Sequence, residues 1–168
     1  MEGFEKYHKI KRAGDAENRD ILTDDSDEIV VQEKVDGANL RIFITDGQLI
    51  FGSRNQQLSS DDGEDSNVSK NFIKCLEYIR ERTNGIDLSE YNGLILYGEC
   101  MVKHTLQYNW DIIPPFLGFD IKDVGTGLYQ ELPFCEKIFS ELNLEMVPLI
   151  GRFECKELKE VLLKNEPL

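Results

Sequence analysis

Residues 28–55 read EIVVQEKVDGANLRIFITDGQLIFGSRN, and their pattern predicts paired β-strands. In residues 40–45, LRIFIT, a leucine or isoleucine stands at every second position, which is the period of a strand. The Asp46-Gly47 dipeptide that follows is a strong signal for a tight hairpin turn. Residues 49–51, LIF, then supply the returning strand. We therefore expect an antiparallel hairpin in this part of the chain.

The rest of the chain alternates short apolar runs with amphipathic segments. The pattern predicts strands at 29–33, 94–97, 116–121 and 147–151, and helices at 70–82, 131–142 and 154–164. It also predicts a loop with at most one short helix over 11–28, and a solvated loop over 56–68. The strands follow one another as neighbours in hairpins, and single helices are inserted between them. This arrangement indicates the α+β class with mostly antiparallel sheets. The length of 168 residues suits one domain over 1–168.

Composition excludes several classes of protein. The chain holds 19 basic and 32 acidic residues, which gives a formal net charge of −13. This negative charge argues against strong, sequence-independent binding to the phosphate backbone of a nucleic acid. Neither an apolar run of membrane-spanning length nor a secretory signal is present, so a cytoplasmic location is expected. Four dispersed cysteines without a CxxC pair predict reduced thiols, and two histidines are too few for a His-rich metal site.

Four residues with the chemistry of a nucleotide pocket fall at or beside predicted strand ends. They are Lys34 in KVDG, Arg54 in FGSRN, Glu99 after LILYG, and Phe119 in FLGFDI. Together they would supply a nucleophile, a cation, an acceptor for a ribose hydroxyl and a ring for stacking on a base. A lysine before an Asp-Gly turn, taken alone, also fits an ordinary hairpin with a solvated lysine, so the prediction depends on the ordered set.

The ordered set resembles the covalent nucleotidyltransferase superfamily of ATP-dependent ligases and mRNA capping enzymes, and within it the RNA ligase 2-type group. The resemblance implies that the Lys34 amine attacks the α-phosphate of ATP and forms lysyl-AMP. AMP then passes to an RNA 5′-phosphate, and an RNA 3′-OH displaces it to seal the strand. Mg²⁺ or Mn²⁺ would be required, with no protein ligand assigned.

The resemblance also implies which residues bind the nucleotide. Asn39 matches an asparagine typical of RNA ligases, Arg54 and Glu99 match residues near the ribose, and Phe119 matches the ring that stacks on adenine. The full set expected to bind the nucleotide is Glu33, Asp36, Gly37, Asn39, Arg54, Glu99 and Phe119. Residues 4–7, FEKY, and 146–152, MVPLIGR, resemble flanking segments of the family. We interpret His104 as a structural hydrogen-bonding residue.

The chain departs from the family after residue 152. We find neither the glutamate of motif IV nor the lysines of motif V, so we expect the front part of an adenylation domain. We expect this chain to adenylate itself poorly or not at all unless the missing segment is added. Two alternatives stay open. One is a non-catalytic nucleotide-binding fragment or module, and the other is a DNA ligase or a capping guanylyltransferase. The acidic chain is expected to bind RNA weakly by itself.

Overall fold

The computed structural model describes residues 5–12, 15–18, 22–60, 70–102 and 106–164. These residues form two compact units, which are described separately. The larger unit comprises residues 1–7 and 35–146, and the smaller comprises residues 8–34 and 147–168. None of the described helices is long and apolar enough to cross a membrane. The expected cytoplasmic location stays a prediction.

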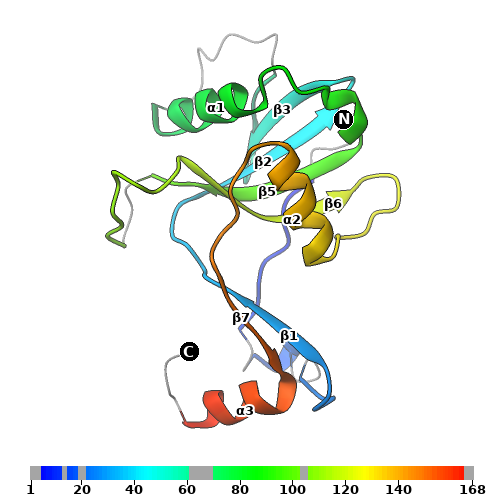
Figure 1. Cartoon of the computed structure of the whole chain (residues 1–168), viewed down its shortest axis with the longest axis vertical. Helices are drawn as coiled ribbons and strands as arrows, with labels where there is room; N and C mark the ends of the chain where they lie inside the picture. The colour runs from blue at the N-terminus through cyan, green and yellow to red at the C-terminus, as the bar shows by residue number, and fades with distance from the viewer. Residues whose placement is uncertain (1–4, 13–14, 19–21, 61–69, 103–105, 165–168) are drawn as a thin grey trace. The chain divides into compact units, whose positions relative to one another are not determined.

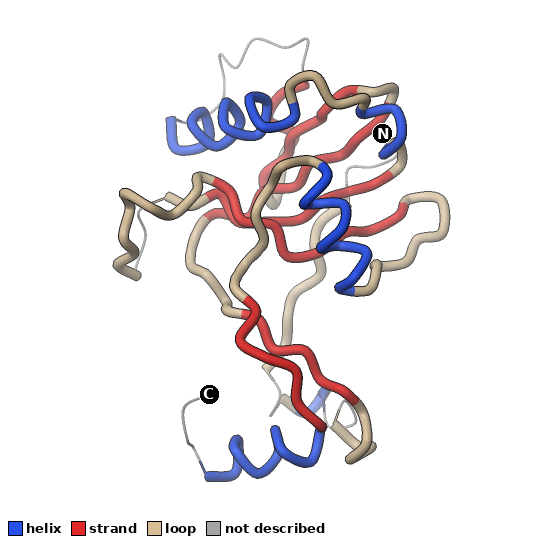
Figure 2. The backbone as a smooth tube through the Cα atoms, viewed as in Figure 1, coloured by secondary structure: helices blue, strands red, loops and turns tan. Residues whose placement is uncertain are grey.

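The larger unit is built on an antiparallel sheet (Figure 2). The sheet has five strands in the order β4-β3-β2-β5-β6. The bounds are β2 (Ala38–Thr45), β3 (Gln48–Ser53), β4 (Gln57–Ser60), β5 (Leu94–Cys100) and β6 (Phe116–Asp123). The predicted hairpin is confirmed as β2–β3. Asp46 and Gly47 have φ values of 52° and 70°, and positive φ at both central residues is what a two-residue turn matched to strand twist requires.

Helices α1 (Lys70–Thr83) and α2 (Leu132–Glu141) pack on one face of this sheet (Figure 1). The core between them takes Leu40 and Ile42 from β2, Leu96 from β5, Leu76 from α1 and Phe139 from α2, among others. Each of these side chains is at most 1% exposed. Their burial supplies the main driving force for folding of this unit. The short 3-10 helix η3 (Leu88–Tyr91) leads into β5.

The other face of the sheet is polar and aromatic. Because side chains alternate along a strand, residues that lie between the core positions point away from the helices. They include Asn39 and Arg41 on β2 and Tyr97 and Glu99 on β5. This is the face on which the site residues gather.

The smaller unit pairs β1 (Glu28–Gln32) antiparallel with β7 (Leu149–Glu154), followed by α3 (Cys155–Lys164). The short 3-10 helix η1 (Ala16–Asn18) also belongs to it. An Arg152–Glu28 ion pair of 2.9 Å joins the two strands. The Cys155 side chain is fully buried, and its backbone N–H donates to the carbonyl of Asp27.

Two predicted boundaries were wrong. Residues 57–60 form the edge strand β4, although residues 56–68 were expected to be a loop. The polar sequence QLSS has no apolar alternation, and pairing with β3 makes it a strand through partners such as Ile50 and Ser60. The strand expected at 147–151 runs from Leu149 to Glu154, because Pro148 has no N–H to donate to a ladder. All four cysteines are buried and none is joined in a disulfide, in keeping with the expected reduced thiols.

Candidate nucleotide site

Glu33 and Lys34 follow β1 and belong to the smaller unit. Both side chains are exposed. The Glu33 N–H donates to the carbonyl of Pro148 at 2.9 Å, which extends the β1–β7 pairing by one position. Val35, which is 4% exposed, begins the larger unit. Lys34 is therefore the exposed last residue of the first segment of the smaller unit, one position after the paired residue Glu33.

The Asp36-Gly37 segment is a bend that leads into β2 and not the tight turn of a hairpin, because β1 pairs with β7 and not with β2. This bend, named the Asp36-Gly37 turn, packs against the end of β5. A Cβ atom added to Gly37 would lie 2.5 Å from the carbonyl oxygen of Cys100 and 3.4 Å from Cβ of Glu99. The first distance is too short for any side chain, so only glycine lets the turn approach this closely. The glycine of the KVDG motif thus fixes the turn beside Glu99.

Two hydrogen bonds with the loop after β5 hold Asp36 in position. The Asp36 N–H donates to the Tyr108 hydroxyl oxygen at 2.8 Å, and the Leu106 N–H donates to the Asp36 carboxylate at 3.1 Å. The Tyr108 ring packs edge-on against Trp110, with centroids 5.6 Å apart. In this structure the Asp36 carboxylate organises the turn, and its predicted contact with nucleotide stays a prediction. His104 lies outside the described residues.

Asn39 and Glu99 face each other across neighbouring strands. They are register partners in the β2–β5 ladder, and both are half-buried. Directly opposed residues of an antiparallel pair hold their Cβ atoms about 4.5–5.5 Å apart. An amide and a carboxylate at that spacing offer both donors and acceptors, which is what recognition of ribose hydroxyls needs.

Arg54 lies at the same end of the sheet. It directly follows β3, whose last residue, Ser53, is the register partner of Leu40 at the start of β2. The turn after β3 is closed by a 2.8 Å bond from the Ser53 N–H to the carbonyl of Gln56. The Arg54 side chain is exposed, so its charge is available to an anion from solvent.

Phe119 occupies a β-bulge in β6. Tyr97 pairs with Asp120 and the next residue, Gly98, pairs with Gly118, so Phe119 is the extra residue on its strand. A bulge redirects a side chain relative to a regular strand. The Phe119 ring is half-buried and meets the Tyr7 ring edge-on at a centroid distance of 5.0 Å.

The larger unit therefore brings most of the predicted set to one end of its sheet. The residues that lie at this end are Asp36, Gly37, Asn39, Arg54 and Glu99. Phe119 lies further along β6. No group of three or more His, Cys, Asp or Glu side chains among the described residues is arranged to hold a metal ion.

The sequence analysis missed Tyr108 as a partner of the site. It stands 72 residues from Asp36, and no local pattern reports a hydrogen bond across that separation. Arg41 was also missed as a polar group on this face, because the alternation identifies the strand and not the partner of this side chain. It is 2% exposed and donates to the carbonyl of Glu5 at 2.9 Å.

Residues 27–167 match the model of the RNA ligase family. The chain therefore belongs to the RNA ligase family. The expected α+β class with mostly antiparallel sheets is confirmed. The RNA ligase 2-type group stays a compatible, finer prediction.

Solved structures of Naegleria gruberi RNA ligase share this fold. A point mutant of that enzyme with ATP and Mn aligns with a TM-score of 0.67 at 17% identity, over 95% of this chain and 47% of that chain. The enzyme with PPi aligns with a TM-score of 0.60 at 20% identity, over 82% of this chain and 41% of that chain. This chain thus covers less than half the length of these structures.

A viral protein is also similar in sequence. The Protein Early 65 kDa of Autographa californica nuclear polyhedrosis virus is 36% identical over 77 residues, which is 44% of this chain and 12% of the viral protein. The similarity covers only a small part of that protein.

Proposed function

We propose that this chain performs the nucleotidyl-transfer step of ATP-dependent RNA ligation, with Lys34 as the nucleophile. The observation that carries the proposal is the close packing of the Asp36-Gly37 turn against Cys100, next to Glu99. Lys34 precedes Asp36 by two residues, so chain connectivity alone keeps its backbone within about 7 Å of this turn. Membership of the RNA ligase family supports the same reaction.

In the proposed step, the neutral Lys34 amine attacks the α-phosphorus of ATP. A P–N bond forms, the bond from that phosphorus to the bridging oxygen breaks, and pyrophosphate leaves while the amine loses a proton. An RNA 5′-phosphate oxygen then displaces the lysine and takes the AMP. Attack by an RNA 3′-OH on this activated phosphate releases AMP and forms the phosphodiester. Splitting the condensation in this way replaces one difficult step with easier ones.

The remaining residues are proposed to hold the nucleotide. Asn39 and Glu99 bind the ribose hydroxyls, Arg54 binds beside the ribose and phosphates, and Phe119 stacks on adenine. Glu33, Asp36 and Gly37 shape the turn around the nucleophile. Bound Mg²⁺ or Mn²⁺ would neutralise the charge of the triphosphate, which favours attack by an electron pair on phosphorus.

The test is covalent labelling of the 168-residue chain with ATP labelled at the α-phosphate, with Mg²⁺ or Mn²⁺. The parent chain is expected to label slowly, and Lys34→Ala is expected not to label. Lys137→Ala removes an exposed lysine on α2 and serves as the matched control, which should label like the parent. Equal labelling of Lys34→Ala and the parent would refute the proposal.

The choice of nucleotide and the binding data separate the alternatives. Faster labelling by GTP than by ATP would favour a capping guanylyltransferase. Unchanged ATP binding by Lys34→Ala, with no labelling of either chain, would favour a nucleotide-binding module.

RNA with a 5′-phosphate and a 3′-OH is the proposed polynucleotide substrate. We expect weak binding because a net charge of −13 repels a polyanion. The affinity should therefore fall only shallowly with salt, since few phosphate contacts release few counterions. Filter binding of nicked duplex RNA and of the same duplex in DNA, across a salt series, measures both preference and slope. Tighter binding of the DNA duplex would contradict the choice of RNA.

A further inference from the structure

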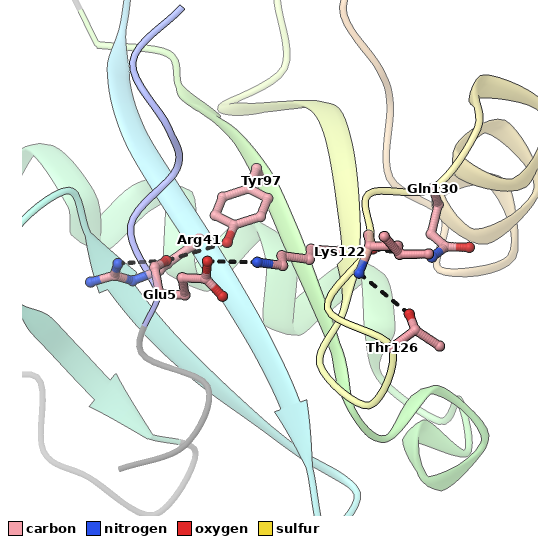
Figure 3. A network of polar contacts seen from close by, with 7 residues as sticks. Glu5, Arg41, Tyr97, Lys122, Thr126 and Gln130 are labelled. Carbon is pink, nitrogen blue, oxygen red and sulfur yellow. Dashed lines mark hydrogen bonds and ion pairs between the residues drawn. The ribbon is translucent and has the colours of Figure 1, made fainter.

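The N-terminal segment at residues 5–7 lies outside the match to the family, which begins at residue 27. In the larger unit this segment runs along the polar face of the sheet (Figure 3). The backbone carbonyl of Glu5 accepts hydrogen bonds from Arg41 Nη1 at 2.9 Å and from the Tyr97 hydroxyl at 3.3 Å. The Glu5 carboxylate forms a 2.6 Å ion pair with Lys122. One residue is therefore held from three strands.

Arg41 and Tyr97 are buried, and Lys122 is half-buried. Arg41 is 2% exposed, Tyr97 is 0% exposed, and the Lys122 side chain is 11% exposed. Hydrogen bonds that involve a charged donor are shorter and roughly twice as strong as neutral ones. A buried guanidinium that lost its acceptor would be costly. The Glu5 contacts therefore fix the start of the chain on the sheet.

Tyr7, two residues further on, connects this anchor to Phe119. Its hydroxyl donates to the Asp120 carboxylate at 3.0 Å, next to the bulge. Its ring meets Phe119 edge-on at 5.0 Å with an interplanar angle of 73°, and it meets Tyr97 at 4.9 Å. Burial and the neighbouring Asp120 raise the pKa of Tyr7, so the hydroxyl stays a donor at neutral pH.

We propose that Tyr7 is a positioning residue that holds the ring of Phe119 in the orientation in which it stacks on the base of a nucleoside triphosphate. The inference rests on the proposed function, because it assumes that Phe119 stacks on adenine. Phe119 is half-buried on a bulge, so the strand alone does not restrict its side-chain rotation. The Tyr7 ring supplies the missing contact from one side, and Glu5 anchors Tyr7.

A double-mutant cycle on ATP affinity tests the coupling. We expect Tyr7→Leu to weaken ATP binding by roughly two- to tenfold, which is the range for loss of one aromatic pair. In the Phe119→Ala background, Tyr7→Leu should cause no further loss, because the ring to be positioned is gone. Independent, multiplicative losses in the double variant would overturn the proposal.

Three measurements separate positioning from mere stability. Ribose triphosphate, which lacks the base, should bind the parent and Tyr7→Leu equally, whereas an equal loss for both ligands would overturn the proposal. Tyr7→Phe keeps the ring and removes only the bond to Asp120, so it should retain most of the affinity. Lys122→Met weakens the anchor and is expected to weaken ATP binding in the same direction as Tyr7→Leu.

The outcomes distinguish the two proposals. If the parent binds ATP and Phe119→Ala weakens binding, but Tyr7→Leu has no effect, the positioning role is wrong and the proposed function stands. If Phe119→Ala has no effect on ATP binding, the stacking role that underlies both is wrong. Thermal melting of each variant confirms that binding is compared between folded chains.

Discussion

Replacement of Gly37 by alanine tests whether the turn after Lys34 is seated as the structure shows. The added Cβ would lie 2.5 Å from the carbonyl oxygen of Cys100, so the turn must retreat by at least about 0.5 Å to reach a 3.0 Å contact. Cys100 pairs with both β2 and β6, so it cannot move aside without breaking a ladder. The turn moves instead.

The magnitude follows from overpacking. Forcing extra atoms into a packed contact costs about 1–3 kcal/mol. For a chain of this size, each kcal/mol lowers the melting temperature by about 2–4 °C, so we expect a decrease of roughly 2–12 °C. A displaced nucleophile is costlier still, because a shift of about 1 Å can slow a reaction about a hundredfold. We therefore expect lysyl-AMP formation to slow by roughly ten- to a hundredfold.

Differential scanning fluorimetry and the labelling rate measure the two effects. Gly125→Ala is the matched control. Gly125 is exposed, and its added Cβ would meet only a carboxylate oxygen of Asp123, at 3.2 Å, which is a much milder contact than the 2.5 Å at Gly37. If Gly37→Ala has the melting temperature and labelling rate of the parent, the turn is not packed against Cys100 and the reasoning fails.

Two further predictions concern the site loop and pH. Tyr108→Phe removes the acceptor for the Asp36 N–H and should lower stability by about 1 kcal/mol, measured by urea unfolding; an unchanged midpoint would contradict the contact. Burial raises the pKa of Cys135 from 9.0 to about 11, so the folded chain keeps a proton that the unfolded chain loses. The stabilisation is full below about pH 9 and is lost as pH rises toward 11. Thermal melts across this range should decline, and less steeply in Cys135→Ala; a flat profile for the parent would contradict the burial.

The fold was largely predictable because its strongest signals are local. The Asp46-Gly47 turn adopts the positive φ values that its residue types favour. The helices α1 and α2 follow from apolar periodicity, and Leu76, Ile79 and Phe139 are the side chains that this periodicity places in the core. The edge strand β4 was missed because its polar residues become a strand only through pairing with β3.

The site was predictable as a set of residues and unpredictable as a set of contacts. The order of the motifs indicated that Asn39 and Glu99 act together, and the register confirms that they are neighbours. The bulge at Phe119 and the hydrogen bond from the Asp36 N–H to Tyr108 depend on contacts between distant parts of the chain. Such contacts leave no period or spacing in a single sequence.

The most direct test of the central claim is intact-mass spectrometry of the chain after incubation with ATP and Mg²⁺ or Mn²⁺, followed by peptide mapping. We expect a slow gain of one AMP on the peptide that contains Lys34 and no gain in Lys34→Ala. An adduct on another lysine, or one that persists in Lys34→Ala, would contradict the assignment of the nucleophile. ATP binding without any adduct in the parent would contradict nucleotidyl transfer itself.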